Sequence, residues 1–195
     1  MCIMLELLDQ KVFLFLNSIN SPFFDPIMFA ISGKVIWVPL YLAILWWLFR
    51  IYGRKFPVVL LFVIIAVILA DQVSVQVFKN TFHRLRPCHE PGIKDMVHLV
   101  NNKCGGLYGF VSSHASNSFN VAVLSLLLIR RKWFSIAILS WAAIIGYSRI
   151  YLGVHYPGDV ICGALVGSFI GYSVVKLFEL TDKKVLSRRE YFNPQ

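Results

Sequence analysis

The stretch FPVVLLFVIIAVILADQVSVQVF, Phe56–Phe78, decides the class of fold. A helix needs about 20 residues to cross the hydrocarbon core of a bilayer, and this mostly apolar run is long enough. The rest of the chain agrees with it. Of the 195 residues, 57% are hydrophobic and 15% are charged, whereas a soluble domain carries roughly 25% charged residues. We therefore predict an all-α membrane protein.

Four further apolar runs predict spans: Val35–Phe49, Ser113–Ile129, Trp133–Tyr147 and Tyr156–Leu180. The shorter of these must extend into polar flanks or cross a locally thin bilayer. Two N-terminal segments, Leu5–Asn20 and Pro22–Ser32, are too short to span, and we expect them to be helices lying in the membrane interface. The prediction is a helical bundle of about five transmembrane helices. The alternative is six spans, with the N-terminal segment inserted.

These runs divide the chain into N-terminal interfacial helices (1–34), a transmembrane domain (35–180) and a basic cytoplasmic tail (181–195). The basic loops Arg50–Lys55 and Arg130–Lys132 fall on the same side as the tail, and basic residues mark the cytoplasmic side. We expect a multi-pass protein of a bacterial inner membrane. The net charge of +9 could suggest a nucleic-acid partner, but clusters between apolar runs are typical of membrane topology, so the expected partners are the bilayer and its lipids.

Polar residues gather at the other ends of the spans, in three clusters. In the first, Lys79 and Arg86 precede Pro87 and stand seven apart, which would put both cations on one face of a helix. In the second, Ser112 is a good N-cap for the run that begins at Ser113 and His114, and a helix N-terminus offers N–H groups to an anion. Taken alone, snorkelling cations and a simple cap would explain both clusters.

The third cluster lies in GYSRIYLGVHYPGDV, Gly146–Val160. His155 and Asp159 stand four apart at the start of a span, where a carboxylate can fix the tautomer of the histidine. A structural ion pair is the ordinary alternative, but ionisable residues in membrane spans are candidates for function. With five spans, all three clusters lie at one membrane face. Arg149 belongs to the third cluster and lies at that face too. Cations and N–H donors suit a phosphoryl group, and two histidines suit a nucleophile and a general acid.

The three clusters together resemble the type 2 phosphatidic acid phosphatase family, the membrane relatives of the vanadium haloperoxidases. The family pattern is K-x6-RP, then PSGH, then SR-x5-H-x3-D. Lys79–Pro87 and Ser148–Asp159 match the first and third parts fully. In the middle part, Val111–His114 keeps the serine and histidine and replaces the proline and glycine. Ser113 must then supply the backbone N–H that glycine supplies in the family.

The resemblance implies a lipid phosphatase, a phosphoric monoester or diphosphate hydrolase that needs no metal or other cofactor. By this resemblance His155 attacks phosphorus, Asp159 orients it, and His114 protonates the leaving oxygen and then activates water. The phosphate-binding residues that it implies are Lys79, Arg86, Ser112, Ser113 and Arg149.

The lipid is left open. The resemblance favours undecaprenyl diphosphate, with lipid A, phosphatidylglycerophosphate and phosphatidic acid as other substrates. Lipid-to-lipid phosphotransfer and a non-catalytic transporter or scaffold on the same fold are the remaining alternatives. His83 could touch a second phosphate, but a place at the wet boundary is the preferred interpretation. For Asp71, deep in its span, we prefer a hydrogen bond between helices over a role in shaping a lipid pocket.

The four cysteines give one further hypothesis. They are too scattered in sequence to indicate a zinc site. Cys88 and Cys104 lie in one loop on the predicted outer side, where oxidation is possible. We expect a disulfide between them that holds Arg86 and the Ser112–His114 turn at a fixed spacing, and we expect Cys2 and Cys162 to stay free.

Overall fold

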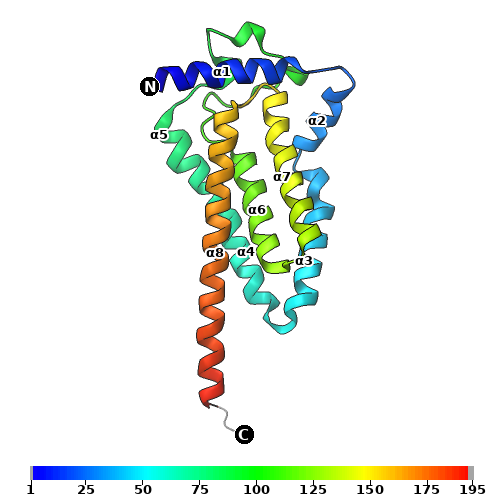
Figure 1. Ribbon diagram of the computed structural model, residues 1–195, viewed down its shortest axis with the longest axis vertical. Coiled ribbons are helices and arrows are strands. Elements are labelled where there is room, and N and C mark those ends of the chain that lie inside the picture. Colours follow the sequence, from blue (N-terminus) through cyan, green and yellow to red (C-terminus); the bar gives the residue numbers. More distant parts are fainter. Residues whose placement is uncertain (1, 193–195) are drawn as a thin grey trace.

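The computed structural model describes the backbone of residues 2–192 and the side chains of residues 4–182. Within that part the chain is helical, with no β-strand and one isolated bridge between Leu85 and Tyr108. Long helices run side by side as a bundle, and one N-terminal helix lies across its end (Figure 1). The predicted fold class, a helical transmembrane bundle with interfacial N-terminal helices, is confirmed.

The N-terminal helices are α1 (Cys2–Ser18) and α2 (Phe24–Ser32). Helix α1 lies across the end of the bundle rather than along it (Figure 1), which favours five spans over six. Asn17 holds it in place, because its amide donates to the carbonyls of Ile150 (3.1 Å) and Tyr151 (2.9 Å) and accepts from the N–H of His98 (2.8 Å). Many large apolar residues of α1, including Leu5, Leu8 and Phe15, are exposed, as expected of a helix in the interface.

Helices α3 (Val38–Tyr52) and α4 (Phe56–Gln72) form the first hairpin. They are joined through Gly53, whose φ of 48° lies in the left-handed region that glycine adopts freely. After α4 the helix widens into a π-helical stretch, Val73–Lys79, and closes with α5 (Asn80–Phe82). His83, with a φ of 45°, then ends the helix.

Helices α6 (Ser113–Ile129), α7 (Lys132–Tyr151) and α8 (Pro157–Phe192) form the rest of the bundle. Gly163, Gly167 and Gly171 of α8 lie one turn apart and face the backbone of α6. A Cβ atom at Gly163 would lie 2.5 Å from the carbonyl oxygen of Ser112, and one at Gly171 would lie 2.8 Å from that of Asn120. Small residues at this spacing let membrane helices approach closely, so the glycines fix α8 against α6.

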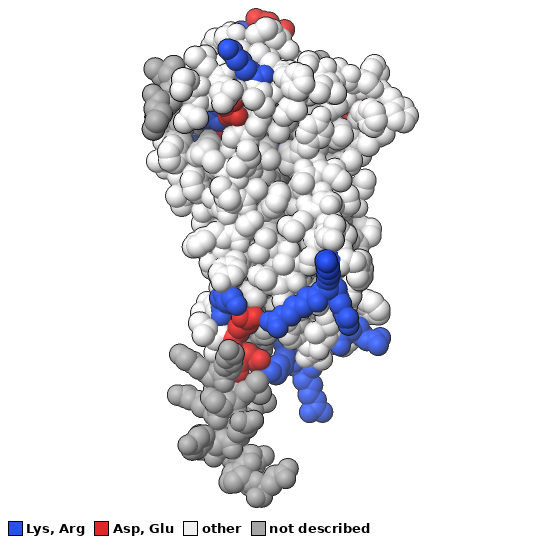
Figure 2. Space-filling model, in the orientation of Figure 1, with Lys and Arg blue, Asp and Glu red and all other residues white. Residues whose placement is uncertain are grey.

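Three helical stretches are long and apolar enough to cross a membrane: Val35–Phe82, Lys132–Tyr151 and Pro157–Asp182. The first has 48 residues and contains both α3 and α4, while α6 is a shorter apolar helix. Figure 2 shows a broad uncharged band across the face in view and Lys and Arg gathered at the end remote from α1. Helix α6 has the predicted bounds, α7 extends the predicted run at both ends, and α8 continues to Phe192, well past the expected end at Leu180.

Candidate active site

The site lies at the end of the bundle beneath α1, where α6 and α8 begin. His155 stands in the loop before α8, and Asp159 is in the first turn of that helix. Both are buried, with 1% and 0% of their surface exposed. Nδ1 of His155 lies 3.4 Å from Oδ2 of Asp159. A proton on Nδ1 directs the lone pair of Nε2 away from the carboxylate, which is the arrangement a nucleophilic histidine needs.

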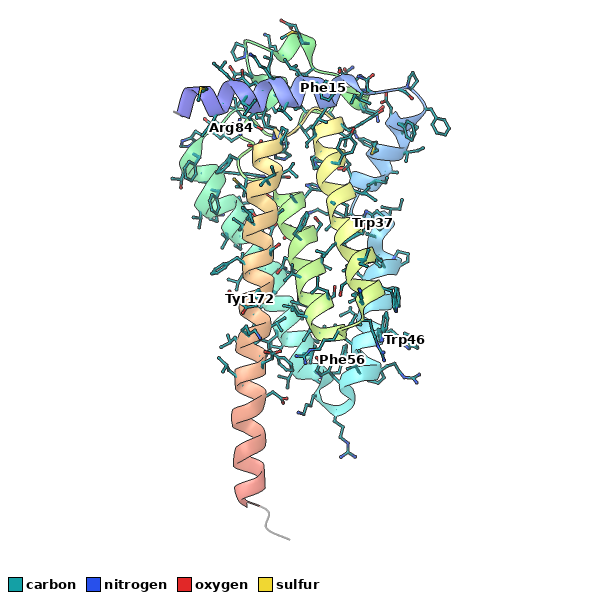
Figure 3. The ribbon with its side chains drawn as sticks, in the orientation of Figure 1. Phe15, Trp37, Trp46, Phe56, Arg84 and Tyr172 are labelled. Atoms are coloured by element: carbon teal, nitrogen blue, oxygen red, sulfur yellow. A yellow bond between two sulfur atoms is a disulfide. The ribbon has the colours of Figure 1, made fainter. Side chains whose placement is uncertain are left out.

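Arg84 is a second partner of Asp159 that our sequence reasoning missed. It donates to Asp159 Oδ1 at 2.7 Å and to Asp9 Oδ2 of α1 at 2.8 Å. It also lies over the ring of Tyr156, 4.2 Å from the centroid. Burial by itself lowers the pKa of Arg84, but the carboxylates of Asp159 and Asp9 outweigh burial and raise it. Figure 3 shows Arg84 beneath α1, so this residue links the interfacial helix to the catalytic loop.

Asp9 closes the same network from the other side. Its Oδ1 accepts from the backbone N–H of Gly158 at 2.8 Å, at the start of α8. The side chain of Asp159 also accepts from the N–H of Tyr156 at 3.1 Å. The carboxylate that faces His155 is therefore fixed by a guanidinium and a backbone donor, and α1 contributes to its placement.

The N-terminus of α6 faces this pair. Ser112 caps the helix as predicted, with its Oγ 3.5 Å from the N–H of Ala115, and its own N–H donates to the carbonyl of Asp159 at 3.0 Å. The N–H groups of Ser113 and His114 come first in the helix and have no intrahelical acceptor. They are the donors that an anion would meet here. His114 lies within electrostatic range of His155, Arg149 and Lys79.

Three cations surround the histidines. Lys79, Arg86 and Arg149 lie close enough to influence the protonation of His155. Burial first, and then these cations, hold the pKa of His155 well below its usual value, so the ring is neutral at neutral pH. Arg149 donates to the hydroxyl of Ser32, and its Nε is buried without a protein partner. An unpaired buried N–H is costly, so this atom points to an anionic ligand.

The expectation that Lys79 and Arg86 share one helical face is wrong. The helix ends at Phe82 because His83 takes a left-handed conformation, and Arg86 follows in extended backbone. Arg86 reaches the site from a loop, and its guanidinium donates to the carbonyls of Tyr108 (3.3 Å), Cys104 (3.3 Å) and Val154 (3.5 Å). The two cations converge by folding of the loop rather than by helical periodicity.

The loop that carries Arg86 is closed by a disulfide between Cys88 and Cys104, whose Cα atoms are 6.0 Å apart. Because the carbonyl of Cys104 accepts from Arg86, the disulfide braces this cation directly. His89 lies close to both sulfurs, in a group with the spacing of a metal site. The sulfurs are bonded to each other, however, and are not available as thiolates. Cys162 is free, and the side chain of Cys2 lies outside the described residues.

Two other residues singled out in the sequence have ordinary surroundings. His83 is exposed and packs its ring against Tyr108, with centroids 4.8 Å apart, so it lies at the wet boundary. Asp71 accepts from Nδ2 of Asn117 on α6 at 3.2 Å, the interhelical hydrogen bond that we expected.

A membrane bundle that brings a histidine–aspartate pair, a second histidine, a helix N-terminus and three cations to one end has the features of a phosphoryl-transfer protein. Comparison with known proteins agrees. The model of the PAP2 superfamily matches residues 56–182, and the chain belongs to this family. The family predicted from the three motifs is thus confirmed.

The chain is 41% identical to a lipid A 4'-phosphatase of Bacteroides thetaiotaomicron over 191 residues, 96% of this chain and 82% of that protein. It is 31% identical to an undecaprenyl-diphosphatase of Sulfolobus acidocaldarius over 144 residues, 74% of this chain and 64% of that protein. Among solved structures, Aquifex aeolicus LpxE matches with a TM-score of 0.67 at 24% identity, covering 85% of this chain and 93% of that one. The protein is a membrane lipid phosphatase.

Proposed function

We propose that the protein hydrolyses a phosphate monoester of lipid A, with His155 as the nucleophile. The relative from Bacteroides thetaiotaomicron supports lipid A, because it is 41% identical and the similarity extends over 96% of this chain. The undecaprenyl-diphosphatase is more distant and matches a smaller part. The comparisons therefore favour lipid A over the isoprenoid diphosphate that the sequence motifs favoured. The observation that carries the chemistry is the buried His155–Asp159 pair, placed among three cations.

In the first step, Nε2 of His155 attacks phosphorus and the bond from phosphorus to the sugar oxygen breaks. His114, which takes up a proton once the anionic phosphate has bound beside it, donates that proton to the oxygen as it leaves, so the dephosphorylated lipid departs as a neutral alcohol. Lys79, Arg86 and Arg149 stabilise the charge on the phosphoryl oxygens, together with the N–H groups of Ser113 and His114. The N–H of Ser112 is already bonded to the carbonyl of Asp159. Ser112 can therefore donate a hydrogen bond to the phosphoryl oxygens only through its hydroxyl.

In the second step, water hydrolyses the phosphohistidine. His114, now neutral, accepts a proton from the water as the oxygen attacks phosphorus, and the bond to His155 breaks. Inorganic phosphate leaves, and both histidines return to their starting states. Asp159 keeps the Nδ1 proton in place throughout, and Arg84 fixes Asp159.

The site opens at the face opposite the basic loops. These loops, Arg50–Lys55 and Arg130–Lys132, lie at the other end of the bundle from α1. Because basic residues favour the cytoplasmic side, we place the active site at the periplasmic face of the inner membrane.

Phosphate release from purified protein in detergent tests the proposal. The substrates are lipid A carrying a single phosphate at either the 4' or the 1 position, undecaprenyl diphosphate and phosphatidic acid. We expect kcat/KM to be highest for one of the two lipid A monophosphates. A higher kcat/KM for undecaprenyl diphosphate than for both would contradict the choice of substrate. Absence of release from every lipid would contradict the chemistry.

A further inference from the structure

A cavity of about 540 Å³ extends from the active site into the bundle. His114 and Ser113 lie at one end of it. Its walls come from α3, α4, α6 and α7 and from the segment between α2 and α3, which contributes Lys34 and Trp37. They are mostly apolar, among them Trp37, Tyr41, Ile44, Val63, Val67 and Ile145. Trp37, which directly precedes α3, is labelled beside α7 in Figure 3. Val67 is 40% exposed and Ile68 54% exposed, so the α4 edge of the cavity faces the lipid-exposed surface.

A polar pair interrupts these apolar walls. Asp71 of α4 and Asn117 of α6 both line the cavity and are joined by the 3.2 Å hydrogen bond between them. Oδ1 of Asn117 and Oγ of Ser113 are buried and have no protein partner. Ser113 and Asn117 stand four apart on α6, so they share the face that lines the cavity. Two polar atoms without partners in such a place indicate a ligand that bonds to them.

An interhelical hydrogen bond alone does not explain this pair. That bond uses one N–H of Asn117 and one oxygen of Asp71, and it leaves the side-chain oxygen of Asn117, a residue that lines the cavity, buried without a protein partner. The side-chain oxygen of Asn117 only accepts, as does the Asp71 carboxylate when ionised, whereas the Ser113 hydroxyl can accept or donate. The acceptors of Asn117 and Asp71 would repel a phosphate and attract N–H or O–H donors. The pair is therefore suited to a part of the substrate other than its phosphate.

The position of the pair relative to His114 identifies that part. Asn117 is three residues further along α6, about one helical turn or roughly 5 Å deeper in the cavity. In the proposed reaction His114 protonates the oxygen that joins phosphorus to the lipid. The atoms attached to that oxygen therefore lie beside Asp71 and Asn117, and the hydrocarbon chains extend along the apolar walls.

We propose that Asp71 and Asn117 form a headgroup subsite that binds the amide N–H and hydroxyl donors of an acylated amino-sugar phosphate. This subsite rests on the proposed function and accounts for its specificity. An isoprenoid phosphate offers no donor beyond its phosphate, so it would leave these acceptors unpaired. A site built to pair a substrate group rejects analogues that lack it.

The test replaces both members of the pair in the double variant Asp71→Leu/Asn117→Leu. Apolar substitution of a buried polar pair keeps the helices in contact. Two quantities are measured: kcat/KM for monophosphorylated lipid A, and the inhibition constant of orthovanadate, an inorganic analogue that fills only the phosphate site. We expect kcat/KM to fall by about tenfold or more through lost hydrogen bonds, and the orthovanadate constant to change by less than about threefold.

Gln76→Leu is the matched control. Gln76 lies on the same helical segment as Asp71, is exposed, and bonds to Asn80 rather than lining the cavity. It should change neither quantity. An unchanged kcat/KM in the double variant would overturn the subsite. Parallel changes in kcat/KM and in the orthovanadate constant would also overturn it, because the pair would then act on the phosphate site. Wild-type protein that releases no phosphate from lipid A would instead refute the proposed function.

Discussion

At the residue scale, the site depends on two histidines with different roles. In the proposed mechanism His155 forms the bond to phosphorus, and no other described side chain is placed to replace it. His155→Ala should therefore abolish turnover, by roughly 10⁴-fold or more. His114→Ala removes a general acid, which typically costs about 10² to 10⁴-fold.

The two variants should also differ in their response to the leaving group. A good leaving group needs no proton. His114→Ala should therefore keep much of the wild-type rate on p-nitrophenyl phosphate, whereas His155→Ala should keep none. Steady-state phosphate release from monophosphorylated lipid A and from p-nitrophenyl phosphate measures this difference. Near wild-type activity of His155→Ala would refute the phosphohistidine.

Arg84 acts through another residue. It binds Asp159 at 2.7 Å and occupies a variable position of the first motif, between Lys79 and Arg86. Removing one partner of a buried ion pair leaves an uncompensated charge and costs about 3–5 kcal/mol, although the 20% exposure of the Arg84 side chain reduces this. Arg84→Gln should lower kcat at least tenfold with little change in KM, because it disturbs the orientation of His155 rather than phosphate binding.

Arg84→Lys is the matched variant. It keeps the charge but cannot bridge Asp9 and Asp159 with a planar guanidinium, so kcat should recover in part. A rise in KM with an unchanged kcat in Arg84→Gln would show instead that Arg84 binds the substrate.

At the scale of the elements, the geometry of the site depends on how α8 packs against α6. His155 and Asp159 precede and open α8, while Ser112 and His114 open α6. Gly167 lies so close to the carbonyl of Ser116 that no side chain fits between them. Gly167→Leu should force the helices apart, lowering both the thermal stability and the rate, the latter by about 10²-fold.

Ser168→Leu provides the control for that change, since it adds the same side chain at the next position of α8, away from the glycine face. Thermal unfolding in detergent and phosphate release are measured together. If Gly167→Leu kept the wild-type unfolding temperature and rate, the close contact between α8 and α6 would not be what holds the two parts of the site together.

The loop between α5 and α6 is the second element with a separate role. Its disulfide encloses fifteen residues, and closing a loop of this size stabilises by ~3 kcal/mol in the chain-entropy model. Cys88→Ser/Cys104→Ser should lower the unfolding temperature and, because Cys104 accepts from Arg86, raise KM. Cys162→Ser, which removes a free thiol, should do neither. The double variant should unfold at the same temperature with and without reductant, whereas reductant should lower the unfolding temperature of the wild-type protein.

At the scale of the whole molecule, the sequence was sufficient to predict the bundle and the family, and the structure brings the residues of the three motifs to one end of the bundle. Apolar runs and fixed spacings along the chain report those features directly. The contact of Arg84 with Asp9 and Asp159 could not be predicted, since 75 residues separate it from each. The path of Arg86 was missed because the left-handed turn at His83 has no glycine to indicate it. The glycines of α8 were visible at a spacing of four, and that pattern could have predicted the contact with α6.

The orientation of the bundle is the remaining property that belongs to the whole molecule. Basic residues gather at one end of an uncharged band in Figure 2, and the loop with Lys94 lies at the other end, beside α1. Since basic loops stay in the cytoplasm, single cysteines at Arg54 and Arg131 should react only after the membrane is permeabilised.

A cysteine at Lys94 should react with an impermeant maleimide in intact cells that have a permeable outer membrane. The background for all three is Cys2→Ser/Cys162→Ser, in which the disulfide protects the two remaining cysteines, Cys88 and Cys104. Labelling of Lys94→Cys only after permeabilisation would place the active site in the cytoplasm. The substrate would then have to be a lipid of the inner leaflet, so the same measurement decides which pool of lipid the phosphatase can reach.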